Sequence, residues 1–374
     1  YKGYYFDIGG HRFFTKLEEV NQLWHDWLGD EFLTRPRKSR IFYNGKFFDY
    51  PLRPFNALSG LGLVESLRIM ASYARSRLFP YADENNFEQW VSNRFGRRLY
   101  TIFFKTYTEK VWGIPCTEIR AEWAAQRIKG LSLGSAVRNA LVPQNGQDIK
   151  TLIEEFEYPR YGPGQMWQRV CDLLRDRGQA VLMETDAVKI EHYHGRVTGV
   201  IARTGAGIQR LDAERVISSM PLPELIGKLD PPAPAEVLDA ARRLSYRDFL
   251  TVMLIINQPH LFSDNWIYVH SSDVSVGRIQ NFKNWSSGMV PDPNMTSLGL
   301  EYFCTAGDPL WRMADAELLA LGRREIEQIG LAQAADVVDG AVVRQPKAYP
   351  VYDATYDGHL ALIRQFLMSF DNLQ

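Results

Sequence analysis

The sequence of 374 residues predicts a mixed fold, α/β with α+β parts, and three patterns support this prediction. Residues 57–142 carry apolar side chains at three- and four-residue spacing, which is typical of helices. Residues 180–220 change to the two-residue alternation of strands, with glycines between them. Residues 249–303 are dominated by runs that predict further strands. We therefore expect helices, a meander and a sheet within one chain.

The first fifty residues predict a strand, a helix and a hairpin. The aromatic and β-branched run Tyr4–Ile8 stops at two glycines, which predicts a strand that ends in a turn. Thr15 is a candidate helix cap, because Glu18 follows three residues later and apolar residues then recur at helical spacing. Within Arg40–Tyr50, Asn44-Gly45 supplies two residues suited to the positive φ angles of a type I′ hairpin turn.

The later elements follow from the same periodicities. They are helices at Asn86–Phe104 and Ala121–Leu141, a meander of Val181–Met183, Ala187–His192 and Arg196–Arg203, a buried strand at Arg215–Ser218, and helices at Asp315–Ile329 and Leu360–Phe370.

Composition excludes several classes of protein. The 43 basic residues are balanced by 44 acidic ones, so the clustered positive charge of a nucleic-acid-binding protein is not expected. The 3 cysteines are widely separated, which argues against a zinc site or a disulfide scaffold and fits a reducing, cytoplasmic compartment. The longest apolar stretch, Phe249–Ile256, is far shorter than the roughly 20 residues of a membrane span.

Four positions stand out as candidates for a site, and three of them have a purely structural alternative. Gly9-Gly10-His11 lets the backbone approach a flat ligand closely, or it forms a simple turn. Tyr107–Trp112 brings two aromatic faces to a ring-shaped ligand, or Trp112 anchors a helix end in the core. Arg160, among Pro and Gly, suits a phosphate. Arg278, on a predicted strand, suits a bound anion or a buried salt bridge to Glu301.

Side-chain catalysis has little support in the sequence. No G-x-S-x-G, H-E-x-x-H or close Cys/His pair occurs, and no G-x-G-x-x-G follows a strand. Aromatic residues make up 13% of the chain, which is typical of a protein that lines a large pocket with rings. A chain rich in aromatics but without an evident nucleophile indicates that a cofactor performs the chemistry.

These candidates lie in segments that resemble one known family. Phe6–Thr15 (FDIGGHRFFT) resembles the glycine-histidine segment of UDP-galactopyranose mutases and of the wider flavin amine oxidase and protoporphyrinogen oxidase superfamily. Further matches follow in the family's order at Tyr43–Pro51, Tyr107–Trp112, Arg160-Tyr161, Leu244–Arg247, Arg278–Lys283, Glu301-Tyr302 and Tyr349-Pro350. Together they cover nearly the whole chain.

The resemblance implies FAD as cofactor and a small-molecule substrate, for which a nucleotide sugar is the first candidate. In the mutases reduced FAD acts as a nucleophile on the sugar, which changes between pyranose and furanose without net redox change. The residues implied to contact FAD are Gly9, Gly10, His11, Val188, Ser218, Met220 and Pro221, and those implied to contact substrate are Tyr107, Trp112 in a mobile loop, Arg160, Arg278 and Tyr349. His11, Arg160 and Arg278 are the implied catalytic residues.

Some positions depart from the mutase pattern. Gly10 stands where the mutases usually carry Pro, Phe14 where they carry a second His, Val111 where they carry Gln, and Asn281 where they carry Glu. The Gly-Gly pair looks more like the oxidase branch of the superfamily. A FAD-dependent oxidoreductase of the amine oxidase or protoporphyrinogen oxidase type therefore stays open, as does a non-enzymatic domain whose aromatics only form the core.

The resemblance also implies a domain organisation of the glutathione-reductase type. We expect an incomplete Rossmann-like FAD-binding domain from residues 1–40, 176–230 and 346–374, a helical insert at 57–150, and a substrate domain with an antiparallel sheet from 41–56, 151–175 and 231–345. The family's opening G-x-G-x-x-G and closing G-R-x-G-x-x-R-Y motifs do not occur. We thus expect a truncated, inactive flavoprotein with weak FAD binding, because the pyrophosphate normally sits at a helix N-terminus. The oligomeric state stays open.

Overall fold

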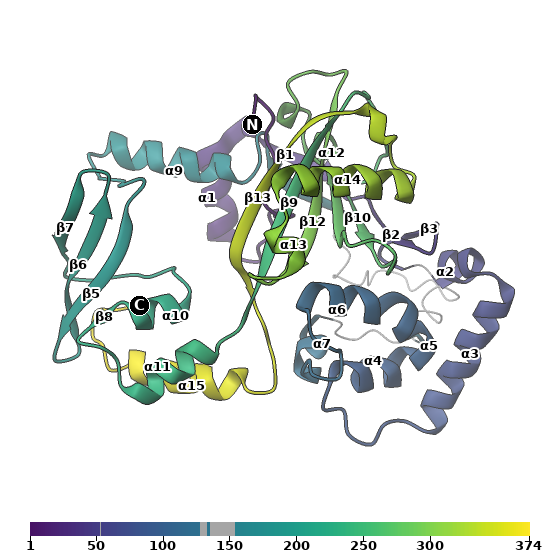
Figure 1. The fold of residues 1–374 in the computed structure, drawn as a ribbon, viewed down its shortest axis with the longest axis horizontal. Helices are drawn as coiled ribbons and strands as arrows, with labels where there is room; N and C mark the ends of the chain where they lie inside the picture. The colour runs from purple at the N-terminus through teal and green to yellow at the C-terminus, as the bar shows by residue number, and fades with distance from the viewer. Residues whose placement is uncertain (53, 128–132, 135–153) are drawn as a thin grey trace. The chain divides into compact units, whose positions relative to one another are not determined.

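The structure is a computed structural model that describes residues 1–52, 54–127, 133–134 and 154–374. The described chain forms two compact units (Figure 1). The first comprises Tyr1–Leu173 with Arg247–Pro346, and the second comprises Leu174–Tyr246 with Lys347–Gln374. Residues 1–40 lie in the first unit, whereas 176–230 and most of 346–374, expected to share a domain with them, lie in the second. The predicted domain boundaries stay predictions, since compactness alone does not define them.

The first unit contains most of the regular elements. Its strands are β1 (Phe32–Pro36), β2 (Ser39–Tyr43), β3 (Lys46–Asp49), β4 (Glu155–Pro159), β9 (Tyr246–Ile256), β10 (Trp266–Val269), β11 (Arg278–Asn281), β12 (Thr296–Cys304) and β13 (Val337–Pro350). The first residue of β9 and the last four of β13 are counted in the second unit. Its helices are α1 (Glu18–Leu28), α2 (Pro54–Leu61), α3 (Leu63–Leu78), α4 (Phe87–Phe95), α5 (Arg97–Tyr100), α6 (Thr106–Trp112), α7 (Ala121–Arg127), α9 (Gly164–Asp176, which continues into the second unit), α12 (Phe282–Trp285), α13 (Pro309–Arg312) and α14 (Asp315–Ile329).

A seven-stranded sheet organises this unit, in the order β13-β9-β12-β11-β10-β2-β3. The pair β2/β10 is parallel, whereas β2/β3, β10/β11, β11/β12 and β9/β12 are antiparallel. The hairpin β2–β3 turns at Asn44 and Gly45, with φ of 50° and 75°, which confirms the predicted turn. The predicted strands between 249 and 303 are confirmed as β9 to β12.

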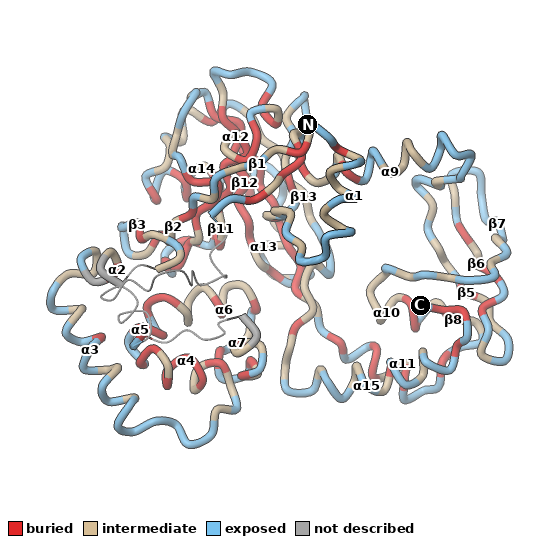
Figure 2. Tube along the Cα trace, turned by 180° about the vertical axis from the view of Figure 1, so that it is seen from behind, coloured by how far each residue is buried: buried red, intermediate tan, exposed pale blue. Residues whose placement is uncertain are grey.

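Helix α14 covers one face of this sheet (Figure 1). Leu298 and Leu300 of β12 share a buried core with Leu318 of α14, and β12 is buried along nearly its whole length (Figure 2). Gly322 allows this close contact, because a Cβ there would lie 3.2 Å from Leu300 Cδ2. The helix spans Asp315–Ile329, as predicted, and is terminated by Gly330, whose φ is 81°. Since strand residues alternate between faces, Gly299 and Glu301 point to the opposite face.

The helices α2 to α7 confirm the helical character predicted for the described part of 57–142. Asn86 caps α4 by accepting a hydrogen bond from the Gln89 amide at 3.0 Å. Gly96 interrupts the expected helix Asn86–Phe104, with φ of 83° and a position where a Cβ would lie 2.9 Å from Tyr73 Cα. Of Ala121–Leu141, residues 128–132 and 135–141 lie outside the described residues.

The second unit is a small four-stranded sheet with helices. Its elements are β5 (Asp186–Tyr193), β6 (Arg196–Thr204), β7 (Gly207–Asp212), β8 (Leu229–Asp230), α10 (Leu222–Gly227), α11 (Ala235–Arg243) and α15 (Tyr356–Leu367). The strand order is β7-β6-β5-β8, and Ile190, Ile226 and Ile363 lie in its core. The predicted last helix is confirmed, although it begins and ends earlier than predicted.

The prediction of a strand at Tyr4–Ile8 is wrong. The segment is irregular, with single backbone hydrogen bonds from Tyr4 to Tyr1 and from Tyr5 to Met289. Its aromatic residues serve packing instead, and Phe6 lies against Phe282 with ring centroids 6.2 Å apart. An apolar run near a chain end pairs as a strand only if an edge is available to it.

The predicted Thr15 cap is also wrong. Helix α1 begins at Glu18, and the capping position is taken by Leu17, whose side chain makes no capping bond. The Thr15 hydroxyl accepts a hydrogen bond from the Leu17 amide at 3.1 Å, so it closes a short turn before the helix.

Two predicted strands of the second unit are absent from its described residues. Val181–Met183 is irregular, and Arg215–Ser218 makes only an isolated parallel bridge from Val216 to Leu373. The third strand of the meander is instead β7, whose residues are nearly all exposed and so lack an apolar alternation. Strand β13 was not predicted for a similar reason, because its residues are mostly half-buried.

Membrane and metal features were searched over the described ranges. Among the described helices, none combines the length and apolar character needed to cross a bilayer. Within the same ranges, no group of His, Cys, Asp and Glu side chains is arranged to hold a metal ion.

Candidate functional site

The sheet face opposite α14 carries a row of polar and aromatic side chains. The strand register places Tyr268 of β10 beside Arg278 of β11, and Arg278 beside Glu301 of β12. Trp266 lies beside Gln280 in the same way. Directly opposed residues on neighbouring strands point to one face of a sheet. We call this row of Trp266, Tyr268, Arg278, Gln280 and Glu301 the site face.

A buried ion pair lies at the centre of the site face. The Arg278 Nε donates to Glu301 Oε2 at 2.5 Å, and the Gln280 amide donates to the other carboxylate oxygen. The two charged side chains are 17% and 1% exposed. Burial raises the pKa of Glu301, and the nearby Arg278 guanidinium opposes that rise. The structure therefore shows the salt-bridge alternative for Arg278, which was expected to hold a substrate diphosphate.

The segment Gly9-Gly10-His11 lies against the site face. Gly9 has φ of 121°, which favours glycine, and a Cβ on Gly10 would lie in ordinary contact with the Gln280 side-chain amide, 3.4 Å away. The His11 ring is fixed by a 2.7 Å contact between Nδ1 and Asp7 Oδ1. That hydrogen bond raises the pKa of His11, and the charges of Arg278 and Glu301 also act on the ring. The structure thus brings these three residues together with Arg278.

Tyr107 of α6 joins the same group of side chains. Its ring stacks on His270 with centroids 4.8 Å apart, and meets Tyr268 edge-on at 5.5 Å. The His270 ring is buried, and burial lowers its pKa to about 3. The neighbouring Lys110 ammonium lowers it further, whereas a hydrogen bond to the Phe103 backbone opposes the shift. His270 is therefore a neutral ring at neutral pH.

This buried imidazole predicts a loss of stability in acid. The pKa of His270 is lower in the folded chain than in the unfolded chain, so the unfolded state binds more protons below about pH 6.5. From pH 7 to pH 5 we expect His270 to reduce the free energy of unfolding by roughly 2 kcal/mol. Urea unfolding at both pH values measures this, with His270→Phe as comparison. An equal loss in both proteins would contradict the assignment.

Lys110 is a positioning residue that sequence reasoning missed. Its Nζ lies within 3.3 Å of four backbone carbonyls, those of Val269, Ser271, Val274 and Val276. Burial lowers the pKa of Lys110 to about 8. The ammonium thereby holds the loop from β10 to β11 against the helix that carries Tyr107. In the sequence, Lys110 is marked only by its position inside the Tyr107–Trp112 segment, which was singled out for its aromatic residues.

The structure places Trp112 and Arg160 in contacts of their own. Trp112 ends α6, is 6% exposed and meets Trp123 edge-on at 5.1 Å, which matches the core-anchor alternative. Arg160 follows β4, and its Nε donates to Glu31 Oε2 at 2.8 Å. The two arginines expected to share a diphosphate, Arg160 and Arg278, are thus each ion-paired with a different carboxylate.

The other predicted cofactor and substrate residues lie in the second unit. Val188 is the unpaired residue of a β-bulge, since Ala187 and Lys189 have partners in β6 but Val188 has none. Met220 packs against the core of that unit, and Pro221 precedes α10. Tyr349 lies near the end of β13. These residues are therefore not part of the site face of the first unit.

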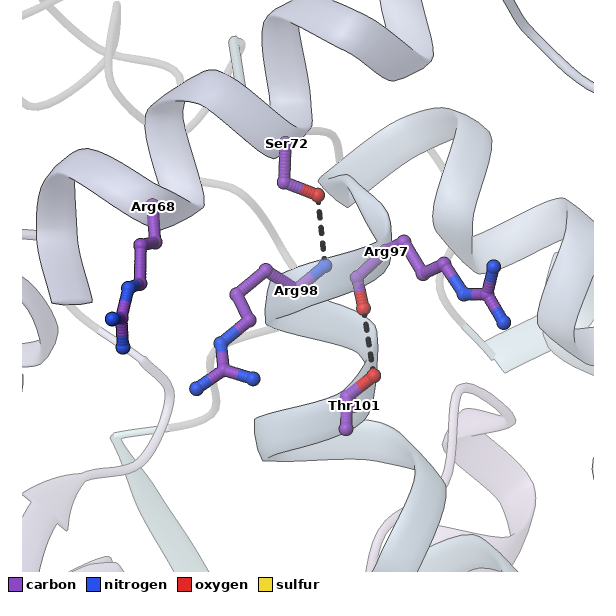
Figure 3. Close-up of a pocket in the computed structure, with 5 residues that line it drawn as sticks. All are labelled: Arg68, Ser72, Arg97, Arg98 and Thr101. Carbon is purple, nitrogen blue, oxygen red and sulfur yellow. Dashed lines mark hydrogen bonds between the residues drawn. The ribbon is translucent and has the colours of Figure 1, made fainter.

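A surface hollow of about 430 Å³ offers a second place with positive charge (Figure 3). It is lined by Arg68, Ser72, Arg97, Arg98 and Thr101. Arg68 and Arg98 both pair with Glu65, and Arg97 lies 3.8 Å from Glu88. Each arginine of this hollow thus has a carboxylate partner, and the partner of Arg68 and Arg98 is Glu65 of α3. These contacts compensate the positive charge, so the hollow does not require a ligand.

Comparison with known proteins places this architecture among flavin-dependent enzymes. The family model described as flavin containing amine oxidoreductase matches residues 1–363, and the chain belongs to that family. A crystal structure of reduced UDP-galactopyranose mutase matches with a TM-score of 0.82 and 22% identity, over 98% of this chain and 78% of that chain. The predicted superfamily membership is thereby confirmed, and so is the mixed fold.

Two further structures share the fold. A putative protoporphyrinogen oxidase from Exiguobacterium sp. 255-15 matches with a TM-score of 0.71 and 16% identity, over 100% of this chain and 82% of that one. Cyclohexylamine oxidase from Brevibacterium oxydans matches with a TM-score of 0.53 and 14% identity, over 95% and 79%. At these identities the likeness shows the fold and leaves the substrate open.

The residues present fit a flavin nucleotide. Gly9 and Gly10 form a loop without side chains beside the polar site face, as a flat ring requires. The Ser218 hydroxyl is buried and has no partner among the described residues, and the bulge at Val188 leaves backbone groups outside the ladder to β6. Buried polar groups of this kind are normally satisfied by a ligand or by water. The second unit thus offers hydrogen-bonding groups that its own described residues leave unused.

Proposed function

We propose that the chain is a FAD-dependent, sugar-nucleotide mutase-like enzyme that interconverts pyranose and furanose forms of a UDP-sugar such as UDP-galactose. The observation that supports this most is the convergence of the glycine loop Gly9-Gly10-His11, Tyr107 and Arg278 on one sheet face. The likeness to a UDP-galactopyranose mutase over 98% of the chain supports the same assignment.

The side chains have distinct roles in this proposal. Gly9, Gly10 and His11 border the flavin ring. Reduced FAD bound there would supply nucleophilic chemistry at the sugar without net redox change. Tyr107 borders the uracil and sugar, and Arg278 of the same site face holds the diphosphate. Asp7 fixes His11 Nδ1, so Nε2 is the ring atom left to act on the ligand.

A second candidate is a FAD-dependent oxidoreductase of the amine oxidase or protoporphyrinogen oxidase type. The family model favours it, and so does the ion pairing of Arg160 and Arg278, which leaves neither guanidinium free of a carboxylate. Under this alternative the aromatic rings of Tyr107 and Tyr268 would border an apolar or amine substrate.

Reduction of the flavin distinguishes these two functions. With FAD supplied in excess, which offsets the weak binding expected from the sequence, the protein should convert UDP-galactopyranose to the furanose form only after dithionite treatment, with no oxygen uptake. Product formation is measured by chromatography of the nucleotide sugars, and oxygen uptake by an electrode. Arg278→Lys, which retains the charge beside Glu301, should weaken substrate binding, whereas Arg68→Lys in the surface hollow should not. Oxygen uptake with an amine or porphyrinogen, without UDP-sugar binding, would favour the oxidoreductase.

A further inference from the structure

Two arginine side chains beside the site face lie on one indole ring. The guanidinium carbon of Arg12 is 6.0 Å from the centroid of Trp266, and that of Arg37 is 5.6 Å from the same ring. Arg37 also lies 5.3 Å from the Tyr50 ring. Arg12 directly follows the glycine loop, and Trp266 is opposite Gln280, whose side-chain amide faces the Cα of Gly10. The pair therefore adjoins the proposed flavin loop within the first unit.

Neither arginine has a counter-ion among the described residues. Arg12 Nη1 and Arg37 Nε are buried without a hydrogen-bond partner, and so is the indole Nε1 of Trp266. Burial and the charge of Arg12 both lower the pKa of Arg37, so the two guanidiniums repel each other in a desolvated place. Nearby arginines differ in this respect, because Arg40 donates to Asp264. Buried charge of one sign is costly unless a partner compensates it.

Two phenol groups add further donors. Tyr50 and Tyr268 meet edge-on with centroids 5.0 Å apart, and no hydrogen bond of either hydroxyl is found in the described part of the chain. Desolvation raises the pKa of Tyr50 to about 12, and both Arg37 and Arg12 act in the opposite direction. Tyr50 is therefore a neutral O–H donor at neutral pH, close to both guanidiniums. A group built of donors fits a ligand that only accepts hydrogen bonds.

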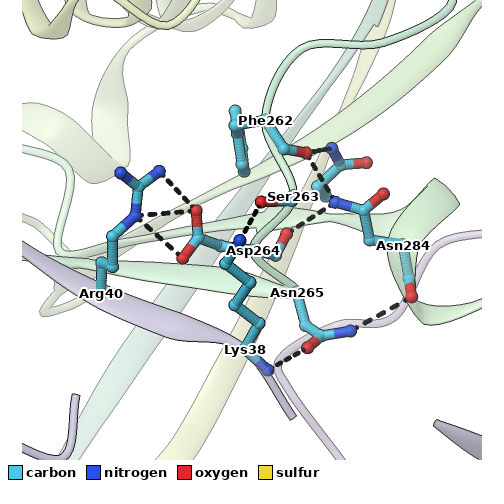
Figure 4. Close-up of polar contacts among 8 residues, drawn as sticks. Lys38, Arg40, Phe262, Ser263, Asp264, Asn265 and Asn284 are labelled. Atoms are coloured by element: carbon cyan, nitrogen blue, oxygen red, sulfur yellow. Dashed lines mark hydrogen bonds and ion pairs between the residues drawn. The ribbon is translucent and has the colours of Figure 1, made fainter. Parts of the chain in front are cut away.

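Lys38 and Asn265, the chain neighbours of Arg37 and Trp266, belong to a polar network (Figure 4). The backbone amide of Lys38 donates to the side-chain oxygen Oδ1 of Asn265 at 2.7 Å, and the backbone amide of Asn265 donates to the Lys38 carbonyl at 2.8 Å. The Asn265 side chain also donates to the Asn284 carbonyl at 3.1 Å. Because Lys38 follows Arg37 and Asn265 precedes Trp266, these bonds fix the backbone on both sides of the cation–indole contact.

We propose that Arg12 and Arg37, with the Tyr50 and Tyr268 hydroxyls and the Trp266 ring, bind the oxyanion of a small-molecule ligand, a phosphate or carboxylate group. Two guanidiniums without carboxylates among the described residues provide charge-assisted hydrogen bonds to such an anion, and the buried Trp266 ring lies against both of them. This site differs from the Arg160 and Arg278 pair expected from the sequence to hold a diphosphate, whose guanidiniums already hold Glu31 and Glu301. It would serve a mutase or an oxidoreductase equally.

Thermal unfolding of the full chain in different sodium salts tests this site. At equal ionic strength we expect phosphate or acetate to raise the melting temperature above its value in chloride, because a ligand of the folded state stabilises it. The salt with the larger effect identifies the anion as phosphate-like or carboxylate-like. The same melting temperature in all three salts would overturn the proposal. Neither flavin nor turnover is needed, so this outcome is independent of the proposed enzymatic function.

Two variants and a matched control locate the effect. Arg37→Gln and Arg12→Gln should each weaken the binding of inorganic phosphate or acetate about 10- to 100-fold, measured by Trp fluorescence or calorimetry. Arg68→Gln, in the surface hollow of Figure 3, should bind as the wild type does. Without anion, Arg37→Gln should melt close to the wild type, since the half-buried Arg37 side chain has no ion pair among the described residues to lose. Unchanged affinity in both site variants, or equal weakening in Arg68→Gln, would refute the assignment.

Discussion

Replacing Glu301 with alanine is expected to lower the free energy of unfolding by about 3–5 kcal/mol. The substitution leaves the Arg278 guanidinium, 17% exposed, without its only ion-pair partner among the described residues, and it also removes the acceptor of the Gln280 amide. A buried charge that loses its partner retains the full cost of its desolvation. Urea unfolding at pH 7, followed by circular dichroism, measures the change.

The pair between Arg160 and Glu31 is the matched control for this experiment. Its side chains are 36% and 42% exposed, so water compensates either charge when the other is removed. Glu31→Ala should therefore cost less than about 1 kcal/mol. Arg278→Met combined with Glu301→Leu should recover part of the loss, because it removes both charges together. A similar cost for Glu31→Ala and Glu301→Ala would show that burial does not govern this pair.

Replacing Lys110 with methionine is expected to cost about 2–5 kcal/mol of unfolding free energy. Methionine fills a similar volume but has no ammonium to donate. It therefore removes the Lys110 hydrogen bonds to four carbonyls of buried residues, those of Val269, Ser271, Val274 and Val276. The amides of Ser275 and Val276 stay bonded to Glu325, so the loop should loosen rather than detach. Hydrogen exchange should accelerate from His270 to Gly277 and in α6.

Lys46 provides the comparison for Lys110. Its ammonium donates to a single carbonyl, that of Gly60, from an exposed side chain. Lys46→Met should change the unfolding free energy by less than about 0.5 kcal/mol and should leave exchange in the 270–277 loop unaltered. If Lys110→Met behaves like Lys46→Met in both measurements, the four contacts of Lys110 do not hold the loop.

Local patterns were sufficient for elements that a turn residue or a clear apolar periodicity marks in the sequence. Asn44-Gly45 predicted a hairpin because the turn itself requires positive φ angles. Helix Asp315–Ile329 was predicted with its observed bounds, since one face meets a sheet and the rest meets solvent. Strands without such a face were missed or misplaced. Strand β7 is exposed, so it shows no apolar alternation. The segment Tyr4–Ile8 has an irregular backbone, although Tyr4 and Phe6 pack against the core.

Site residues divide in the same way. The glycines of the Gly9-Gly10-His11 loop and Tyr107 were recognised because the residue types carry the signal: a turn that excludes side chains, and an aromatic ring beside a helix end. Arg12, Arg37 and Lys110 were not recognised, since an arginine or lysine in a sequence gives no indication of whether a carboxylate will face it. The same limit applied to Arg278, whose ion pair was one of two open alternatives.

The sequence by itself determined the family, the mixed fold and the loop that adjoins the site face, because glycine positions, periodicity and residue order are properties of the chain. Only the tertiary structure decided which charges are compensated. Strand register sets Arg278 beside Glu301 and Trp266 beside Gln280, while Arg12 and Arg37 meet on an indole more than 200 residues away in sequence. Electrostatic compensation depends on distance in space, and the distances arise when strands far apart in sequence pair.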